Sequence, residues 1–521
     1  MQTTSEQFTT HAQADIRPLT WRCFISFEKE YDAAITFFTI GVSAIGGGDF
    51  IPGNGDVVQE WDKYIYDDFT NRIMSIEWSR EVEQFASITM GMADIVLDNH
   101  DDYFTTGSGS AIDGHILPYR PVRLLAGFGD EAIPVFIGLT ARMPIIDEVN
   151  KTATFHCIDY MYSLMNRPLL ESSLYTDMYT DEILDELFQL AGLTSVQLEL
   201  DHGLVAYPYV YFKKDTKLIT AVKKLLEVEA GRIYMDENGV IHFKNRQNYT
   251  STPVHTFTPY KDIIAFSTRK EDEIINVVEI KGAVKEVRPK QAFYYLDGTI
   301  SPETAILVPA NSSAIFWAEF QSVVTSVDTP VISATATTSN FSVNRASDGS
   351  STEDTTDVTV SAATLFTDTY KLTFANSGNV DLYVYKLELF GTPVADVETI
   401  FVREEDATSI AAYDERILSL SSEMFQSRTE AESRALSILH DWSTFGGVNQ
   451  MQVKGSMAFQ LDDTVRVNLY DNIQDYKITK ITNQIKQPAR YTQILWLRKF
   501  DPDTYFTIGV SAIGGSDVIA P

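Results

Sequence analysis

The stretch from Ile116 to Leu164 constrains the fold more than any other part of the chain. It holds apolar runs of strand length at 122–128, 134–143 and 153–161, separated by the turn sequences Gly-Asp-Glu and Asp-Glu-Val-Asn-Lys. Runs of this length between turn residues are typical of neighbouring strands in an antiparallel sheet. None of these residues forms a reactive motif. The stretch therefore predicts a β-sheet scaffold, whose function must be inferred from its architecture.

Helical periodicity replaces this pattern between 166 and 247. The segment 180–193 places apolar residues on one stripe, with Thr180 predicted as N-cap and Gly192 as the end of the helix. A second helix is predicted over 216–231, and Asn238-Gly239 then predicts a hairpin. A later helix over 428–445 should turn four residues inward: Ala431, Ala435, Ile438 and Leu439.

A near-exact internal repeat is the most unusual feature. TFFTIGVSAIGGGDFI at 36–51 returns as TYFTIGVSAIGGSDVI at 504–519, with 13 of 16 positions identical. Either both copies form the same local hairpin in two related modules, or each adds a strand to the sheet of a neighbouring chain. The second interpretation makes the following residues candidates for an inter-subunit strand: Phe38, Ile40, Val42, Ile45, Asp49, Phe506, Ile508, Val510, Ile513 and Asp517.

Charge and targeting signals exclude several classes of function. The formal net charge of −31 opposes binding to phosphate groups, because nucleic-acid binding depends on Lys and Arg displacing counterions. The same charge would suit the wall of a channel through which DNA passes without binding. The alternative is that the charge simply keeps the protein soluble. The first 18 residues lack a basic region followed by an apolar run, so we expect no signal peptide, and no segment is apolar enough to cross a membrane.

Candidate catalytic and metal-binding residues are few. The sequence lacks the common motifs of nucleophilic, zinc and phosphate-binding sites. Cys23 and Cys157 lie in strand-like runs and are predicted as buried thiols, and His156 should point away from its neighbour Cys157. Residues 98–102, with the sequence Asp-Asn-His-Asp-Asp, lack the spacing of a calcium loop and predict a solvated loop. Adjacent carboxylates elsewhere give neither the burial nor the separation that a glycosidase needs. We therefore expect no enzyme activity, no cofactor and no metal.

The order of elements is nevertheless familiar. The runs VRLLAGF, VFIGLTARMP and ATFHCIDYMYSLM, followed by a pair of helices, resemble the baseplate or tail-tip hub proteins of tailed bacteriophages. That family includes the T-even hub and its equivalents in siphophages and gene transfer agents. The helix and hairpin over 216–243, the meander after Gly455 and the run KLTFANSGNVDLYVYKLELFGTPV are also similar to the family. The repeat and the Ser/Thr-rich part of 298–400 depart from its pattern.

The resemblance implies a mainly β, multidomain fold with α+β parts. The predicted division is an N-terminal tail segment (1–18), a first tube-like β-barrel domain (19–165), a small α+β domain (166–250), a second tube-like β domain with helices (251–297 and 401–503), an all-β insert (298–400) and the C-terminal repeat (504–521). Two tube-like domains in each chain imply that a homotrimer forms a pseudo-sixfold ring matching a hexameric tail tube.

The function implied is that of a structural hub at the tail tip of a virion, assembled in the host cytoplasm. Its implied partners are distal tail and tail-tube ring proteins, the tape measure protein and tail-tip fibre or spike proteins, while DNA passes through the lumen without specific binding. Two other functions remain open. A receptor- or carbohydrate-binding tail protein would expose aromatic residues of the insert, for which Trp317, Tyr383 and Tyr385 are candidates. A tail-associated cell-wall hydrolase would need buried carboxylates of altered pKa.

Overall fold

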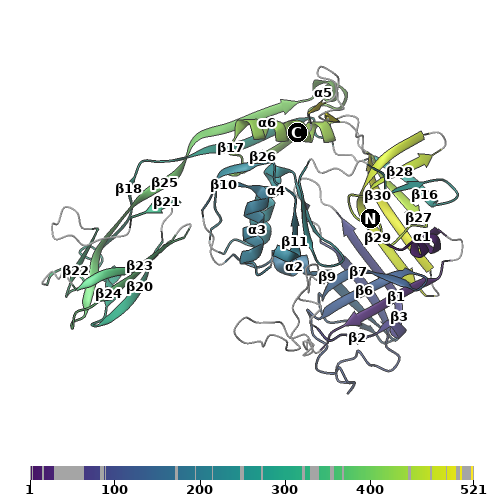
Figure 1. Ribbon diagram of the computed structural model, residues 1–521, viewed down its shortest axis with the longest axis horizontal. Coiled ribbons are helices and arrows are strands. Elements are labelled where there is room, and N and C mark those ends of the chain that lie inside the picture. The colour runs from purple at the N-terminus through teal and green to yellow at the C-terminus, as the bar shows by residue number, and fades with distance from the viewer. Residues whose placement is uncertain are drawn as a thin grey trace, which may run out of the picture.

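The computed structural model contains four hydrophobic cores among the residues it describes. These residues are 2, 4–13, 17–27, 64–81, 87–88, 90–169, 174–193, 195–213, 215–246, 252–270, 274–319, 323–328, 340–351, 357–366, 369–443, 447–469, 472–487, 490–499, 505–506 and 518–519. Figure 1 shows two β modules on the right, a helical region in the middle and a long β arm reaching to the left. The prediction of a mainly β, multidomain fold with helices is confirmed.

The first β module encloses its own core between an antiparallel sheet, the loop 99–120 and the N-terminal helix α1 (Glu6–Gln13). In β9, apolar residues alternate inward, so that Phe155 and Cys157 are buried while His156 lies on the opposite face, as predicted. The strands are β1 (Leu19–Ile25), β2 (Asp67–Asp68), β3 (Ile73–Glu81), β5 (Met92–Asp98), β6 (Pro121–Phe128), β7 (Glu131–Thr140), β8 (Ile145–Asp147) and β9 (Thr152–Asp159).

Two of the strands predicted in this module are too long. The strand predicted over 134–143 ends at Thr140, and the one predicted over 153–161 ends at Asp159. Asp159 is the N-cap of helix α2 (Tyr160–Met165), and its carboxylate accepts a hydrogen bond from the Tyr162 backbone N–H. An N-cap of this kind favours helix over strand at the next residue.

The second β module combines two strands from the middle of the chain with four from its C-terminal part. It has a separate core and joins the first module where β29 pairs with β3, with Ile485 opposite Ile76 and Ile481 opposite Arg80. The two modules thereby share one 14-stranded sheet. The strands are β15 (His255–Phe257), β16 (Ile263–Lys270), β27 (Gly447–Val453), β28 (Thr464–Leu469), β29 (Asn472–Lys486) and β30 (Arg490–Lys499).

The α+β region packs against helix α6 (Arg428–Trp442) around a third core, and the four inward residues predicted for α6 are buried. The strand β4 (Ser87–Ile88) reaches over from the first module and pairs with β13. The other elements are β10 (Tyr175–Tyr179), α3 (Thr180–Leu190), β11 (Leu198–Leu200), β12 (Ala206–Val210), α4 (Leu218–Glu229), β13 (Arg232–Met235) and β14 (Ile241–Lys244).

The predicted N-cap of α3 is wrong. The N-cap is Tyr179, whose backbone N–H donates to the Glu182 carboxylate at 2.8 Å. Thr180 is instead the first helical residue, and its hydroxyl donates at 2.7 Å to the fully buried carboxylate of Glu229. Thr180 therefore provides a hydrogen bond to the buried carboxyl group of Glu229 on α4, which outweighs its preference for the cap position.

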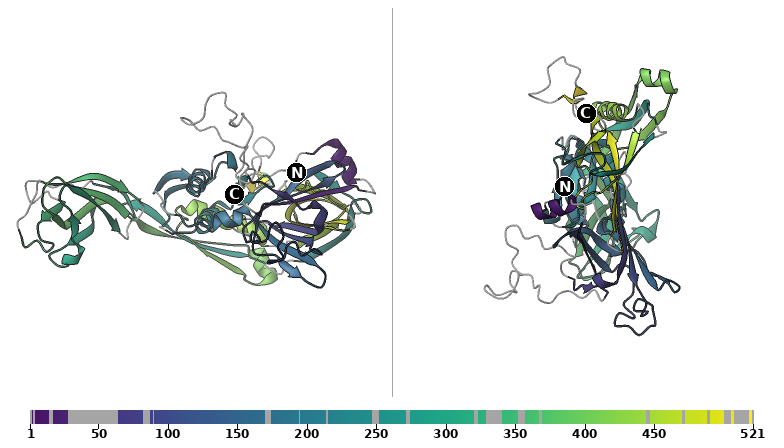
Figure 2. Two further views of the ribbon diagram at one scale, coloured as in Figure 1. Left: turned by 90° about the horizontal axis from the view of Figure 1, so that it is seen from below. Right: turned by 90° about the vertical axis from the view of Figure 1, so that its right-hand side faces the viewer.

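The arm consists of β17 (Val277–Val287) and β25 (Leu382–Glu405), a strand of 24 residues. In Figure 2 the arm extends away from the rest of the molecule and carries a small β-sandwich at its end. The sandwich has the fourth core, and residue 400, the predicted edge of the insert, lies inside β25.

The arm and sandwich also contain β18 (Gln291–Asp297), β19 (Ile306–Val308), β20 (Ser312–Glu319), β21 (Val324–Val327), β22 (Phe341–Asn344), β23 (Val358–Leu365) and β24 (Thr369–Asn376). At the body end, α5 (Ala407–Tyr413) and β26 (Ile417–Ser421) follow. Nothing in this arrangement decides the predicted domain boundaries, which stay predictions.

Candidate assembly surfaces

The face of the shared sheet that lies opposite the two cores is polar. Lys480 of β29 contacts Glu81 of β3 at 2.5 Å, and the Gln484 amide of β29 donates to Glu77 of β3 at 2.6 Å. These contacts cross the seam between the modules, and the registers of β3 and β29 place them on one face. Further along, His156 and Asp94 pair across β9 and β5 at 2.5 Å. Polar pairs thus lie on this face at the seam and between β5 and β9, together with the exposed apolar residues Met92 and Ile145. The inward apolar residues of the same strands fill the cores.

A buried polar junction lies where the two β modules meet the α+β region. Glu237, in the turn between β13 and β14, is paired with Arg80 of β3, and these side chains are only 8% and 12% exposed. The second carboxylate oxygen of Glu237 accepts from Gln460 of the second module at 3.0 Å. Breaking a buried pair leaves an uncompensated charge, which costs more than the pair itself contributes. The turn of this hairpin therefore fixes the position of both modules.

Ionisable groups around this junction have altered pKa values. Burial raises the pKa of Asp159 to about 6, although hydrogen bonds from the Gly91 and Tyr162 amides oppose the rise. Burial likewise lowers the pKa of Lys477 to about 8, partly offset by the nearby Asp462 carboxylate. Asp462 itself pairs with Arg232 at 2.5 Å. These shifts follow from the packing of three parts of the chain, because each group is desolvated by its neighbours.

The N-terminal segment ties the modules together on another side. Arg17 donates to the carbonyls of Lys454 and Gly455, both in the second module. Its guanidinium also lies over the rings of Phe128 in β6 and Tyr491 in β30, at 5.5 and 5.8 Å from their centres. A cation between two aromatic faces combines electrostatic attraction with burial of its apolar stem. Arg17 therefore contacts both modules at once.

The inter-subunit strand predicted from the repeat lies almost wholly outside the described residues. Phe506 alone is described, in the short strand β31 (Tyr505–Phe506), which pairs in parallel with β32 (Val518–Ile519) of the same copy. The other nine candidates fall outside these residues: Phe38, Ile40, Val42, Ile45, Asp49, Ile508, Val510, Ile513 and Asp517. The exchange of this strand between chains remains a prediction.

The remaining candidates have ordinary structural roles. Cys23 and Cys157 are buried free thiols. In the acidic loop, Asp101 pairs with Arg72 and Asp102 with Lys151. Within the part of the chain that the structure describes, no three His, Cys, Asp or Glu residues gather as a metal site, and no helix is long and apolar enough to span a membrane.

The aromatic candidates of the insert lie at the end of the arm. The Trp317 side chain is 43% exposed, stacks on Phe366 with ring centres 5.6 Å apart, and has the Lys371 ammonium 5.1 Å from its ring. Tyr383 and Tyr385 are half-buried in β25. The structure does not bring Trp317 onto the same strand as these tyrosines, since it belongs to β20 in the other sheet of the sandwich.

The sequence analysis missed Arg80, Glu237 and Arg17. Arg80 stands in an alternating strand, where an inward charge signals a buried partner. Nothing local identifies that partner, because Glu237 lies 157 residues further along. Arg17 falls in a polar segment that was assigned to a tail.

The fold defines a mainly β protein in which two modules share one sheet and a long arm carries a third β unit. It is similar to the tail protein from Neisseria meningitidis MC58 (9% identity, 83% of this chain and 93% of that chain, TM-score 0.46). It is also similar to the 43 kDa tail protein of prophage MuSo2 from Shewanella oneidensis (9% identity, 83% of this chain and 94% of that chain, TM-score 0.45). A third similar structure is prophage tail protein gp18 from Listeria monocytogenes EGD-e (9% identity, 84% of this chain and 92% of that chain, TM-score 0.39). No family model and no curated protein matches the sequence.

Proposed function

We propose that the chain is a structural hub of a phage tail tip or baseplate. In this role three copies form a ring that continues or closes the tail tube, anchor peripheral tip proteins and open to let DNA pass. The observation that carries the proposal is the seam between β29 and β3, which makes one wall of two β modules with both cores on one face. Three such chains supply six modules, the number needed to match a hexameric tube. Closing the wall into a ring also removes exposed sheet edges.

In the proposed ring, the polar face of the shared sheet points toward the lumen. Lys480 on this face is paired across strands with Glu81, so its charge is already matched by a carboxylate. The chain as a whole is strongly acidic. A lumen lined by this face would therefore let DNA move without specific binding. Hub function of this kind needs no catalytic group.

Native mass spectrometry of the purified full-length chain tests the ring. We expect a homotrimer at micromolar concentration, and electron microscopy should show a ring with six similar lobes around a channel. A chain that stays monomeric at high concentration would contradict the proposal. Deletion of 504–521 tests the inter-subunit strand separately: weakened assembly of a folded chain supports strand exchange, and unchanged assembly supports the local interpretation.

A second candidate function is receptor or carbohydrate binding by the insert. It is favoured by the position of the sandwich at the end of a long arm and by the exposure of Trp317 there. Glycan-array binding by the full-length chain, lost in Trp317→Ala, would support an adhesin. Binding that is absent or insensitive to this substitution would argue against it. Wall hydrolysis is a third possibility, which cleavage of peptidoglycan by the purified chain would reveal.

A further inference from the structure

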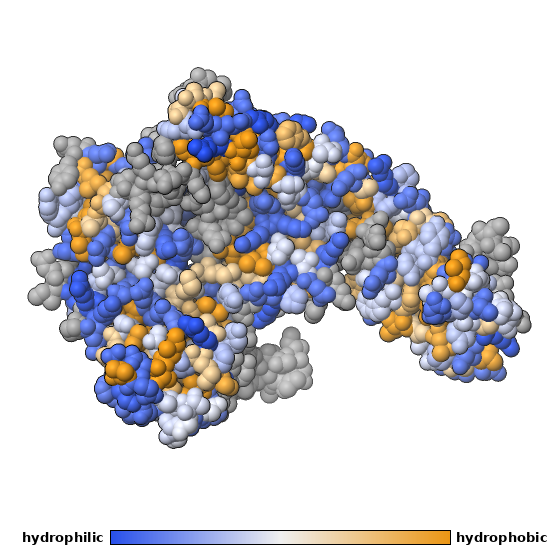
Figure 3. All heavy atoms as spheres, turned by 180° about the vertical axis from the view of Figure 1, so that it is seen from behind, coloured by the Kyte–Doolittle hydropathy of each residue, from blue (hydrophilic) through white to orange (hydrophobic). Residues whose placement is uncertain are grey.

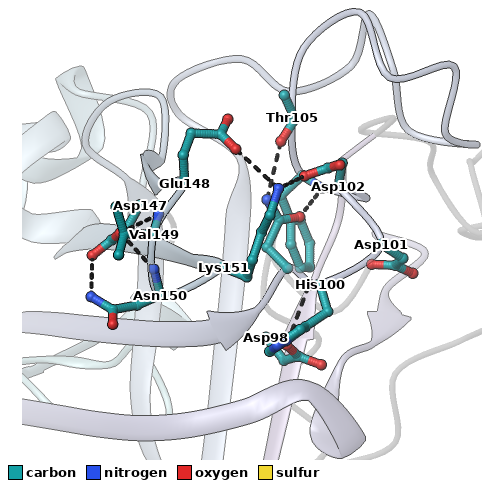
Figure 4. A network of polar contacts seen from close by, with 12 residues as sticks. Asp98, His100, Asp101, Asp102, Thr105, Asp147, Glu148, Val149, Asn150 and Lys151 are labelled. Atoms are coloured by element: carbon teal, nitrogen blue, oxygen red, sulfur yellow. Dashed lines mark hydrogen bonds and ion pairs between the residues drawn. The ribbon is translucent and has the colours of Figure 1, made fainter.

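The turn between β8 and β9 exposes the apolar side chain of Val149 to solvent, and hydrogen bonds and ion pairs hold the turn in place (Figure 4). The Asp147 carboxylate accepts hydrogen bonds from the backbone N–H groups of Val149 and Asn150, each at 2.9 Å. Lys151 closes the turn by contacting Asp102 at 3.0 Å and Glu148 at 3.1 Å. Val149 is nevertheless 91% exposed. A side chain held in this way loses little conformational entropy when a partner covers it.

Further apolar side chains lie near this turn. We call five exposed residues the β8 ledge: Leu117, Tyr119, Met143, Ile145 and Val149. The Tyr119 backbone N–H donates to the Thr140 carbonyl at 2.7 Å, so the end of the loop 99–120 runs beside the end of β7, from which the chain leads through Met143 into β8. The strand β8 is paired with β9 and with no other strand among the described residues. Figure 3 shows that hydrophobic residues interrupt the hydrophilic surface of the first module, at the lower left of that view.

The margin of the β8 ledge is acidic. Asp147 and Glu148 belong to the turn, and Asp98 and Asp102 lie beside it at the end of β5 (Figure 4). Hydrogen bonds from the backbone and side chain of Asn150 hold the pKa of Asp147 below its usual range, and the contact with His100 does the same for Asp98. Asp147 and Asp98 are therefore ionised at neutral pH. The acidic margin lies at the Val149 end of the ledge, where Lys151 is already shared between two carboxylates. The exposed Arg142 precedes Met143 in the chain.

We propose that the β8 ledge docks a different protein, whose facing surface is apolar at its centre and basic at its margin. Charge complementarity selects this partner, since carboxylates around an apolar centre attract a basic rim and repel an acidic one. A second copy docked through the same surface is a poor occupant, because the acidic margins of the two ledges would face one another. The partner is sought among tail components, so the search for it rests on the proposed function.

Photo-crosslinking in phage-producing cells tests the proposal on the full-length chain. We place p-benzoylphenylalanine at Val149 and, as a matched control, at Ile473, which is 60% exposed in the second module. Val149 should crosslink to one other protein, at a peptide rich in Lys and Arg, and the control should not. A crosslink to a second copy, to an acidic peptide, to many proteins alike or to nothing would overturn the proposal.

Two further measurements separate docking from the proposed function. Val149→Glu adds a like charge to the ledge and should reduce the co-sedimenting amount of the crosslinked protein at least tenfold, while Ile473→Glu leaves it unchanged. Equal retention in both variants contradicts docking at the ledge. If the chain is missing from purified particles although Val149 still captures a basic partner, the proposed function fails and the docking site stands.

Discussion

At the scale of single residues, Asp159 shows how burial sets a dependence on pH. Its carboxylate is 3% exposed, caps α2 and accepts from the Gly91 amide. Its pKa is raised to about 6, while in an unfolded chain it is about 3.9. Between these values the folded chain binds more protons than the unfolded chain. Stability contributed by Asp159 is therefore full below about pH 4, falls as pH rises and is lost above about pH 6.

The variant Asp159→Asn removes this titration. From pH 4.5 to 7, we expect the wild-type chain to lose about 2 kcal/mol of stability relative to the variant, since each pKa unit corresponds to roughly 1.4 kcal/mol. Calorimetric scans across this range measure the difference. Asp130→Asn, in the exposed turn between β6 and β7, is the control and should show no such trend. A constant difference between wild type and Asp159→Asn would contradict the assignment.

At the scale of elements, alternation and helical periodicity predicted β6, α3, α4, α6 and the β13–β14 hairpin, because each pattern is local. The same reasoning placed His156 and Cys157 on opposite faces of β9. The pairing of β29 with β3 was beyond reach, since residues some 400 positions apart leave no local signal of their partnership. For the same reason, Arg80 and Glu237 could not be matched from the sequence. The sequence pattern identified only the repeat at 36–51 and 504–519 as a candidate site. The contact between Arg80 and Glu237 depends on tertiary pairing and is visible only in the structure.

The seam predicts that the second module supports the core of the first. Ile485 belongs to β29, yet its side chain is 1% exposed and packs in the first core, opposite Ile76. Ile485→Ala should cost about 2–5 kcal/mol through lost burial and a cavity. Hydrogen exchange should accelerate in β3 and β5. Ile473→Ala, at an exposed site, should change stability by less than about 0.5 kcal/mol. Faster exchange confined to β15, β16 and β28 would show that the modules are not coupled.

At the scale of the whole molecule, net charge opposes the assembly that the fold favours. Copies with a charge of −31 repel one another, and salt screens this repulsion, with a Debye length of about 30 Å at 0.01 M and about 10 Å at 0.1 M. The proposed trimer should therefore become more stable as NaCl is raised from about 10 to 150 mM. Sedimentation velocity measures the trimer fraction. A trimer that dissociates in salt would instead be joined by ion pairs between copies.

The β8 ledge should respond to salt in the opposite direction. Its carboxylates attract a basic partner, so the same increase in NaCl should weaken docking while it strengthens the ring. Val149→Glu should likewise reduce docking and leave the trimer fraction unchanged, because it alters one exposed turn. Parallel sedimentation of both variants at low and moderate salt separates the two contacts. If ring and partner respond alike to salt and to this substitution, the ledge is part of the contact between copies.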